Sequence, residues 1–143
     1  MLIQLLIGAG LLAVCVIIHV TVLDIVAIRL RSIIAAYDFP LPQGLRLTIL
    51  VGASLSVFLS HIVQVCIWAT AFLAAGEFTS LETALYFSTV TFTALGYGDV
   101  VASSDWRLLA SFEAATGLFL FGLSTAFLFV VLSNIWSAAR KPT

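Results

Sequence analysis

Apolar side chains fill three long stretches of the chain, at residues 2–23, 47–76 and 106–139. The first is interrupted only by Gln4, His19 and Thr21, the second has no formal charge, and the third has Glu113 as the only charge in its interior. A helix that crosses a bilayer needs about 20 apolar residues. The pattern therefore predicts three transmembrane helices, and the second and third are long enough to tilt or protrude.

A fourth apolar stretch, Leu81–Leu95, is too short to cross a bilayer and ends at the sequence Gly-Tyr-Gly-Asp of residues 96–99. Thr79 and Glu82 have the spacing of a capping box, with Thr79 as the N-cap, which predicts a helix start. Backbone that is not helical survives at membrane depth only where it is buried in protein or lines a water-filled cavity. The segment is therefore predicted to enter the membrane and return to the same side.

The composition limits the class of protein. Only 9% of the 143 residues are charged and 62% are hydrophobic, whereas a soluble domain carries roughly 25% charged residues. The surroundings are therefore membrane lipid, and the net charge of −1 argues against nucleic acid as a partner. Cys15 and Cys66 lie inside apolar stretches, which favours two buried thiols over a disulfide. No nucleophile–base pair or metal-ligand spacing is present, so neither an enzyme, an organic cofactor nor a small-molecule substrate is expected.

Charged residues predict the orientation. Five of the six basic residues lie in the 29–46 segment or the C-terminal tail, and only Arg107 lies on the opposite side. The positive-inside rule then predicts an external N-terminus and a cytoplasmic C-terminus. Four acidic residues share the predicted outer side, where they would attract cations or merely keep a loop hydrated: Glu77, Glu82, Asp99 and Asp105. No helix is rich in arginine, so a voltage sensor is not expected.

Gly96 and Gly98 have a chemical use in the re-entrant segment. Glycine adopts left-handed backbone angles at little cost, and alternating these with ordinary angles can turn successive carbonyl oxygens to the same side. A column of such oxygens can replace the water shell of an ion. The preceding short helix would point the negative end of its dipole at the same place. A simple turn that joins two helices is the alternative interpretation.

Residues 77–135 resemble the pore of the potassium channel family, in which backbone carbonyls of a filter select the ion. The likeness rests on the helix sequence STVTFTA, the filter LGYGD, Trp106, and the pair Gly117 and Gly122, and it includes the second apolar stretch as an outer helix. It implies an all-α membrane protein of three transmembrane helices, a re-entrant pore helix and a selectivity filter. Four copies would form a homotetramer around one pore in the plasma membrane, of the prokaryotic inner-membrane type, with K⁺ as the permeant ion.

The resemblance divides the chain into four parts: an additional N-terminal transmembrane helix (1–30), a cytoplasmic linker (31–46), an ion channel pore domain (47–137) and a short cytoplasmic tail (138–143). The pore domain divides further into an outer helix, a pore helix (80–93), a filter (94–99) and an inner helix (106–137). The resemblance implies that backbone carbonyls of the filter bind K⁺, at Ala94, Leu95, Gly96 and Tyr97, with Gly98 completing the filter.

The filter departs from the family pattern in two ways. Ala94 stands where a threonine hydroxyl usually completes the innermost ion site, so we expect a weaker or altered inner site with selectivity retained. The acid after the filter, Asp99, is commonly braced by tryptophan and sometimes by glutamate on the pore helix, and here the matching positions hold Tyr86 and Val90. We expect Tyr86 to contact Asp99 behind the filter, with Thr93 as a further bracing residue.

The inner helix has several implied roles. Gly117 and Gly122 would be its hinge. Residues at three- or four-residue steps would share one face, which lines either the cavity or an ordinary helix–helix seam: Leu118, Phe121, Thr125, Phe129 and Ser133. Within that face, Phe121 and Phe129 could narrow the pore into a hydrophobic gate.

Four polar groups at membrane depth remain. Glu113 would pack behind the pore helix and bond to Thr89, Thr91 or backbone groups, in a structural or a pH-sensing role. His19 and His61 could lie at similar depths, because the first two helices run antiparallel. Hydrogen-bonded structural histidines are one interpretation, and a metal pair or proton sensor is the other. Asp24 could be paired by arginines or backbone N–H groups near the cytoplasmic end.

The sequence thus predicts a small potassium-selective channel that conducts passively. A weakly selective monovalent cation channel is one alternative, since Ala94 changes the inner site. A non-conducting or assembly subunit, in which the first helix docks a partner, is the other.

Overall fold

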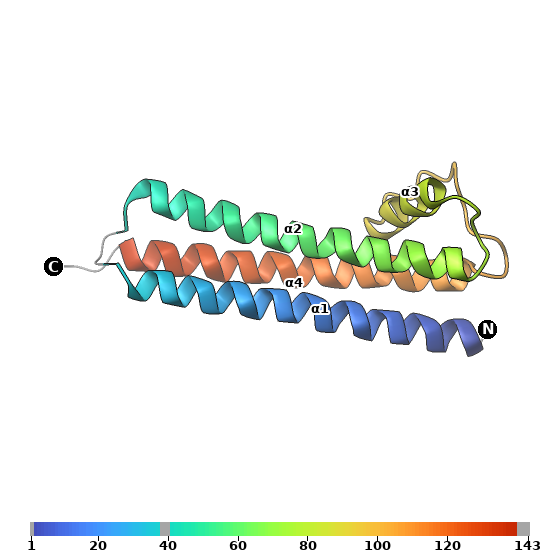
Figure 1. Ribbon diagram of the computed structural model, residues 1–143, viewed down its shortest axis with the longest axis horizontal. Helices are drawn as coiled ribbons and strands as arrows, with labels where there is room; N and C mark the ends of the chain where they lie inside the picture. The colour runs from blue at the N-terminus through green and yellow to red at the C-terminus, as the bar shows by residue number, and fades with distance from the viewer. Residues whose placement is uncertain (1, 38–40, 140–143) are drawn as a thin grey trace.

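Four helices make up the computed structural model, which describes residues 2–37 and 41–139. They are α1 (Leu2–Ala35), α2 (Gln43–Ala74), α3 (Leu81–Phe92) and α4 (Arg107–Ala139), and the described residues form no strand. The three long helices lie side by side as an elongated bundle, and the short α3 lies at the end of the bundle where the chain begins (Figure 1). By length and composition, α1, α2 and α4 can each cross a membrane.

The connection between α1 and α2 is shorter than the predicted linker of residues 31–46. Helix α1 continues to Ala35, so that Arg29 and Arg31 lie on the helix, and α2 begins at Gln43. Residues 24–35 contain no glycine or proline, which lets α1 continue beyond its uncharged stretch. Pro42 directly precedes α2 with a φ of −56°, a backbone angle that proline favours and that suits a helix start.

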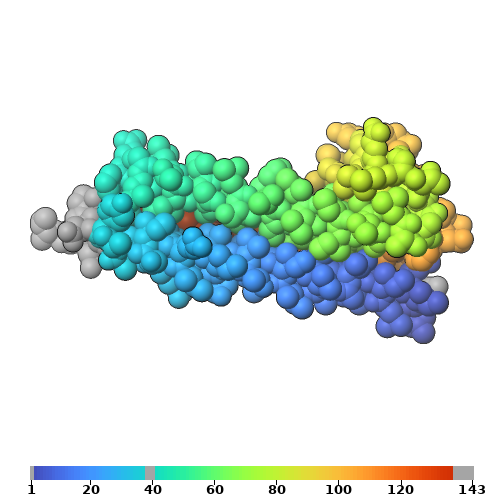
Figure 2. Space-filling view, in the orientation of Figure 1, coloured from blue at the N-terminus to red at the C-terminus, as the bar shows by residue number. Residues whose placement is uncertain are grey.

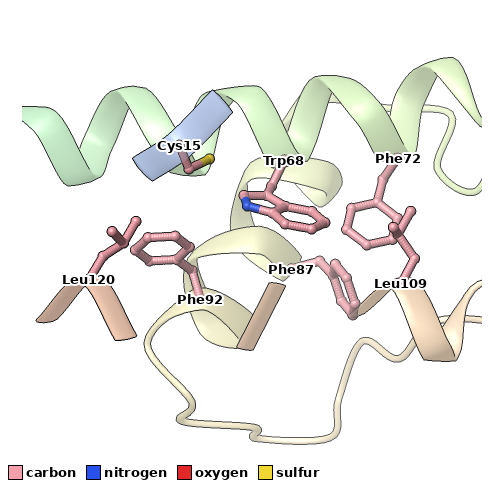
Figure 3. Packing of buried hydrophobic residues seen from close by; sticks show 7 residues of the cluster. All are labelled: Cys15, Trp68, Phe72, Phe87, Phe92, Leu109 and Leu120. Atoms are coloured by element: carbon pink, nitrogen blue, oxygen red, sulfur yellow. The ribbon is translucent and has the colours of Figure 1, made fainter. Parts of the chain in front are cut away.

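The end of the bundle that holds α3 and the 93–106 connection is called the filter end here, and the end that holds the α1–α2 connection is the distal end. The filter end contains a core to which all four helices contribute (Figure 3). Its buried members are Cys15, Trp68, Phe72, Phe87, Phe92, Leu109 and Leu120. Cys15 is buried as predicted, whereas the prediction for Cys66 was wrong, because its side chain is exposed on α2.

The distal end has a smaller core of aliphatic side chains from the three long helices, namely Leu30, Ile49, Ala53, Val131 and Ile135. Grooves separate the helices there. The groove between α1 and α2 has a volume of about 350 Å³ and is lined by Arg29 and Thr48 among apolar residues. Figure 2 shows a hollow between the two helices at this end, through which α4 is visible.

Candidate functional site

Helix α3 begins one residue later than the sequence indicated. Ser80, rather than Thr79, is the N-cap, and its Oγ accepts a hydrogen bond of 3.1 Å from the backbone N–H of Thr83. The predicted capping box at Thr79 and Glu82 was therefore wrong by one position. Ser80 satisfies one of the backbone donors that every helix start leaves free.

The C-terminal end of α3 leads directly into the predicted filter. Ala94 has a φ of 57°, and the backbone N–H groups of Ala94 and Leu95 donate to the carbonyls of Thr91 (2.9 Å) and Val90 (3.0 Å). This is a Schellman motif, in which the left-handed residue is usually glycine. A left-handed conformation costs an alanine roughly 1–2 kcal/mol. The helix therefore ends in a strained turn at the first filter residue.

The backbone of the predicted filter alternates in handedness. Gly96 and Gly98 have φ angles of 58° and 80°, and together with Ala94 they are left-handed, whereas Leu95 and Tyr97 are not. The side chains of residues 94–99 are exposed in the single chain, and Tyr97 is 69% exposed. No Cβ clash would exclude a side chain at Gly96 or Gly98, so the positive φ is the reason for glycine at both positions.

Asp99 accepts a hydrogen bond of 2.6 Å from the hydroxyl of Tyr86, which is the contact expected from the sequence. This bond lowers the pKa of Asp99 and raises the pKa of Tyr86, because it stabilises the carboxylate and the neutral phenol. Thr93 instead bonds back to its own helix, since its Oγ1 donates to the carbonyl of Thr89 at 2.7 Å. Its role as a filter brace stays a prediction.

The two glycines of α4 differ in their surroundings. A Cβ on Gly117 would overlap the backbone carbonyl of Phe92, the last residue of α3, whereas a Cβ on Gly122 would meet nothing within 4 Å. Glycine at 117 therefore lets α4 approach the end of α3 directly. Helix α4 is continuous through both positions. The hinge role of the pair stays a prediction, and close packing explains Gly117 without it.

The predicted cavity face is open in the single chain except at one residue. The side chains of four of its members are exposed: Leu118, Thr125, Phe129 and Ser133. Phe121 instead turns into the bundle, where its ring centroid lies 4.5 Å from His61 and 5.7 Å from Phe92. Phe121 is partly buried by these contacts, whereas Phe129 is exposed, and the gate role of both residues stays a prediction.

Glu113 is fully buried behind α3, as expected, but not with the expected partners. The hydroxyl of Thr89 donates to the carbonyl of Leu85, and neither carboxyl oxygen of Glu113 has a hydrogen bond among the described residues. Ser88 lies close enough to interact, yet its hydroxyl also lacks a hydrogen bond of normal geometry. The predicted bonds to Thr89 and Thr91 were therefore wrong, and the pH-sensing role stays a prediction.

Sequence reasoning missed a pair of hydrogen bonds, called the clamp here, behind the predicted filter. The carboxylate of Glu77, just after α2, accepts hydrogen bonds from the backbone N–H (2.5 Å) and the Oγ (2.8 Å) of Ser103. It thereby fixes the segment that returns from the filter to the end of the outer helix. The residues lie 26 positions apart, and no spacing rule connects them. The only signal in the sequence was that one of the two residues, Ser103, lies shortly before a helix start.

His19 and His61 lie at the same depth, as predicted, with stacked rings whose centroids are 4.9 Å apart. Their hydrogen-bond partners Ser60, Gln64 and Ser124 were not singled out from the sequence. Asp24 is exposed on α1. Within residues 2–37 and 41–139, no group of three or more His, Cys, Asp or Glu side chains could hold a metal ion.

The family model described as ion channel, Ion_trans_2, matches residues 47–134, which is more than half of the chain. The match covers α2, α3, the filter segment and most of α4, and it leaves α1 outside. No curated protein and no solved structure matches the chain. The matched family is one of channels and not of enzymes, and the three long apolar helices agree with a multi-pass membrane protein. The chain therefore belongs to the ion channel family.

Proposed function

We propose that the chain is one subunit of a homotetrameric potassium-selective channel, in which α3 is a re-entrant pore helix and residues 94–98 form the selectivity filter. The observation that supports this most directly is the alternating backbone of that segment, with positive φ at Ala94, Gly96 and Gly98. Such alternation turns successive carbonyl oxygens of Ala94, Leu95, Gly96 and Tyr97 toward one side, where they can replace the hydration shell of K⁺.

Two further features support an assembly of several copies. The filter segment is exposed along its whole length in the single chain, although non-helical backbone at membrane depth must be covered by protein or line a water-filled cavity. The open face of α4 also presents Leu118 and Phe129, which are 60% and 70% exposed. Three neighbouring copies around one axis would cover both surfaces, and that face of α4 would line the cavity below the filter.

The proposed orientation follows from charge. Glu77, Glu82 and Asp99 lie at the filter end, whereas Arg29, Arg31 and Arg46 lie at the distal end. The positive-inside rule then puts the filter end outside the cell and the distal end in the cytoplasm. Protease accessibility of a C-terminal tag in right-side-out and inverted vesicles tests this, and cleavage from the outside would contradict it.

The decisive experiment is ion flux into liposomes that contain the purified chain, with the oligomeric state measured by native mass spectrometry. We expect a tetramer, flux driven by K⁺ and not by Na⁺, and block by Ba²⁺. Gly96→Ala should lower flux, because it adds a second left-handed alanine, at a φ of 58°, to the one already present at Ala94. Gly10→Ala on α1, where a Cβ meets nothing within 4 Å, is the matched control and should conduct normally.

The two alternatives give different results in the same experiment. The absent hydroxyl at Ala94 is the observation that favours a weakly selective monovalent cation channel, and comparable K⁺ and Na⁺ flux would establish it. A pure tetramer without any flux would favour a non-conducting or assembly subunit and contradict the proposal.

A further inference from the structure

A buried polar ring joins three helices at mid-bundle, outside the proposed ion path. Four side chains form it: His19 from α1, His61 and Gln64 from α2, and Ser124 from α4. Each is buried, and His19 and Gln64 are fully so. An ionisable side chain buried between membrane helices is by default a candidate for a functional site. This ring includes the only two histidines of the chain.

The atoms of the ring form a closed cycle. Gln64 Nε2 lies 3.2 Å from His19 Nδ1, and His19 Nε2 lies 3.1 Å from Ser124 Oγ. Ser124 Oγ lies 2.9 Å from His61 Nε2, and His61 Nδ1 lies 3.0 Å from Gln64 Oε1. Ser60 Oγ accepts the second N–H of Gln64 at 3.0 Å. Within the cycle of His19, Ser124, His61 and Gln64, every donor has one acceptor when both imidazoles are neutral and the hydrogen bonds run in one direction. Ser60 Oγ also lies 3.1 Å from His19 Nδ1.

In that neutral cycle the amide of Gln64 decides the tautomer of each ring. Its N–H donates to His19 Nδ1, so His19 is protonated at Nε2, and its Oε1 accepts from His61, so His61 is protonated at Nδ1. The Nε2 atom of His61 is then an acceptor, which receives the hydroxyl hydrogen of Ser124.

One proton can be added without breaking the network. If His61 Nε2 takes up a proton, it becomes a donor to Ser124 Oγ, and the hydroxyl of Ser124 turns to the carbonyl of Leu120, 2.8 Å away on its own helix. Ser124 Oγ then accepts from both histidines, which its two lone pairs permit. The only movement is a rotation of one hydroxyl.

A second proton has no comparable position. On His19 Nδ1 it would face the N–H group of Gln64 and compete for Ser60, and it would place two positive rings in a stack with centroids 4.9 Å apart. If the amide of Gln64 were turned around, its N–H group would face Nδ1 of His61 instead, and a proton there would meet the same repulsion. The hydrogen-bond geometry therefore accommodates one added proton but not a second.

Two features beside His61 would offset part of the cost of burying a positive charge there. The ring centroids of Phe121 and Phe92 lie 4.5 Å and 5.9 Å from that of His61, within the range of cation–π attraction. Phe92 is also the last residue of α3, and the C-terminal end of a helix attracts cations.

Few other titratable groups face the ring. On α1 the nearest are Cys15, one turn before His19, and the exposed Asp24, five residues after it. On α2 the nearest is Cys66, two residues after Gln64, but its side chain is exposed. On α3 it is Tyr86, whose hydroxyl donates to Asp99. On α4 the nearest is Glu113, which lies about 16 Å along the helix from Ser124 at 1.5 Å per residue.

We propose that the ring of His19, His61, Gln64 and Ser124 is a binding site for one proton, taken up at Nε2 of His61. Helix α1, which lies outside the matched family region, supplies one of the four side chains, His19. The bound charge lies against the C-terminal end of α3, the same end that the proposed filter uses to attract cations. If the proposed function holds, proton uptake lowers the K⁺ flux.

Nitrogen NMR of the full-length protein in lipid nanodiscs, labelled with ¹⁵N only in histidine, tests the site without any use of conduction. With two histidines in the chain, each ring nitrogen can be followed from pH 8 to pH 4. We expect one ring to gain a proton while the other stays neutral. Both rings becoming charged, or both staying neutral over the whole range, would overturn the proposal.

Variants at the ring give the test its matched controls. Ser124→Ala removes the acceptor for the bound proton and should lower the midpoint of uptake by about one pH unit, or tenfold in proton affinity. Gln64→Glu places a carboxylate beside His61 and should raise the midpoint by a similar amount. Ser54→Ala, which removes a part-buried hydroxyl that bonds only to Leu50 of its own helix, should change nothing. Equal midpoints in Ser124→Ala and Ser54→Ala would also contradict the site.

The link to the pore helix has a separate measurement. K⁺ flux of the wild type should fall on acidification with the midpoint seen by NMR, and that midpoint should move with Ser124→Ala but not with Ser54→Ala. Proton uptake without any change in flux would overturn the link while the binding site stands. Absence of flux at every pH would instead contradict the proposed function, and the NMR result would still decide the site.

Discussion

The two ends of the bundle are packed differently. At the filter end the rings of Phe72, Phe78 and Phe87 interlock with centroids 4.9–6.1 Å apart, and α4 touches the backbone of α3 at Gly117. At the distal end the buried side chains are aliphatic, and grooves of about 350, 480 and 230 Å³ run between the pairs of long helices. The core beside α3 and the proposed filter is thus closely packed, although a groove of about 590 Å³ lies beside Gln4 and Asp105 at the same end. The distal end has grooves between each pair of long helices.

The two ends of the bundle also differ in their hydrogen bonds. At the filter end they join separate segments, as Glu77 does with Ser103, and Gln4 of α1 with the backbone carbonyl of Asp105. At the distal end the hydroxyls of Thr48 and Ser54 bond to carbonyls of their own helix. Because lipid tails are as apolar as the helices, close packing and bonds between segments are what hold membrane helices together. The filter end should therefore be the more sensitive to substitution.

The largest effect is expected at Gly117. In Gly117→Ala the new methyl group would overlap the carbonyl of Phe92, so α4 must move away from α3. Since backbone rather than a flexible side chain is in the way, we expect loss of K⁺ flux and of the stable tetramer. Both are measured in liposomes and by native mass spectrometry.

Gly122→Ala is the matched control on the same helix, because its Cβ would meet nothing within 4 Å. It should keep the tetramer and gain up to about 1 kcal/mol of helix stability. If Gly122→Ala alone reduced flux while Gly117→Ala did not, the glycines would act as a hinge and the packing interpretation would be wrong.

The next effect concerns the strained residue between pore helix and filter. Ala94→Gly removes a cost of roughly 1–2 kcal/mol and should raise the temperature at which the tetramer dissociates. Ala94→Thr restores the hydroxyl of the family pattern, but a β-branched residue at a φ of 57° is a genuine outlier. It should lower that temperature. A more stable Ala94→Thr tetramer in K⁺ would mean that the backbone at this residue is not left-handed in the assembled filter.

Long elements were predictable from the sequence because each depends on local pattern. Three apolar stretches give three helices, although charged residues near Arg29 hid the last part of α1. The positive φ at Gly96 and Gly98 follows from their chemistry, whereas the same angle at Ala94 does not, because alanine rarely adopts it. The left-handed angle at Ala94 arises from the Schellman motif that ends α3, and this motif is visible only in the structure.

Contacts between distant segments were predictable only where residue type restricts the partner. The Tyr86–Asp99 bond was expected because the resemblance to the potassium channel family puts Tyr86 at a position that braces the acid, and its hydroxyl can donate to Asp99. The contact of Phe121 with His61 was not predictable, because helical periodicity identifies the residues of one face but not which of them contact a neighbouring helix. Glu77 and Gln64 gave no signal at all, since a single acid or amide in the sequence does not identify a partner on another helix.

A smaller effect is expected from Tyr86→Phe, which removes the bond to Asp99. The bond lowers the pKa of Asp99, so the support it gives is present at neutral pH and is lost as pH falls through that lowered pKa. It raises the pKa of Tyr86, so the support is also lost as pH rises through that raised pKa. The wild type should therefore hold a steady flux longest near neutral pH.

In Tyr86→Phe we expect a faster decline of flux at neutral pH and a flatter pH profile, measured as the decay of K⁺ flux after activation. Tyr37→Phe removes an exposed phenol at the opposite end of the bundle and is the control. Equal decay in Tyr86→Phe and the wild type would remove the bracing role.

The smallest effect is expected at Glu77, whose two bonds to Ser103 hold the segment that returns from the filter. In Glu77→Gln one amide oxygen remains to accept the backbone N–H, so the loss should be within about 1 kcal/mol. Glu77→Ala removes both bonds and should lower the dissociation temperature further, whereas Glu82→Ala tests an acid in the first turn of α3 with no such clamp. If all three variants lost the same stability, the negative charge at this end, rather than the clamp, would be the cause. The contrast between the two ends would then rest on the aromatic core and Gly117 alone.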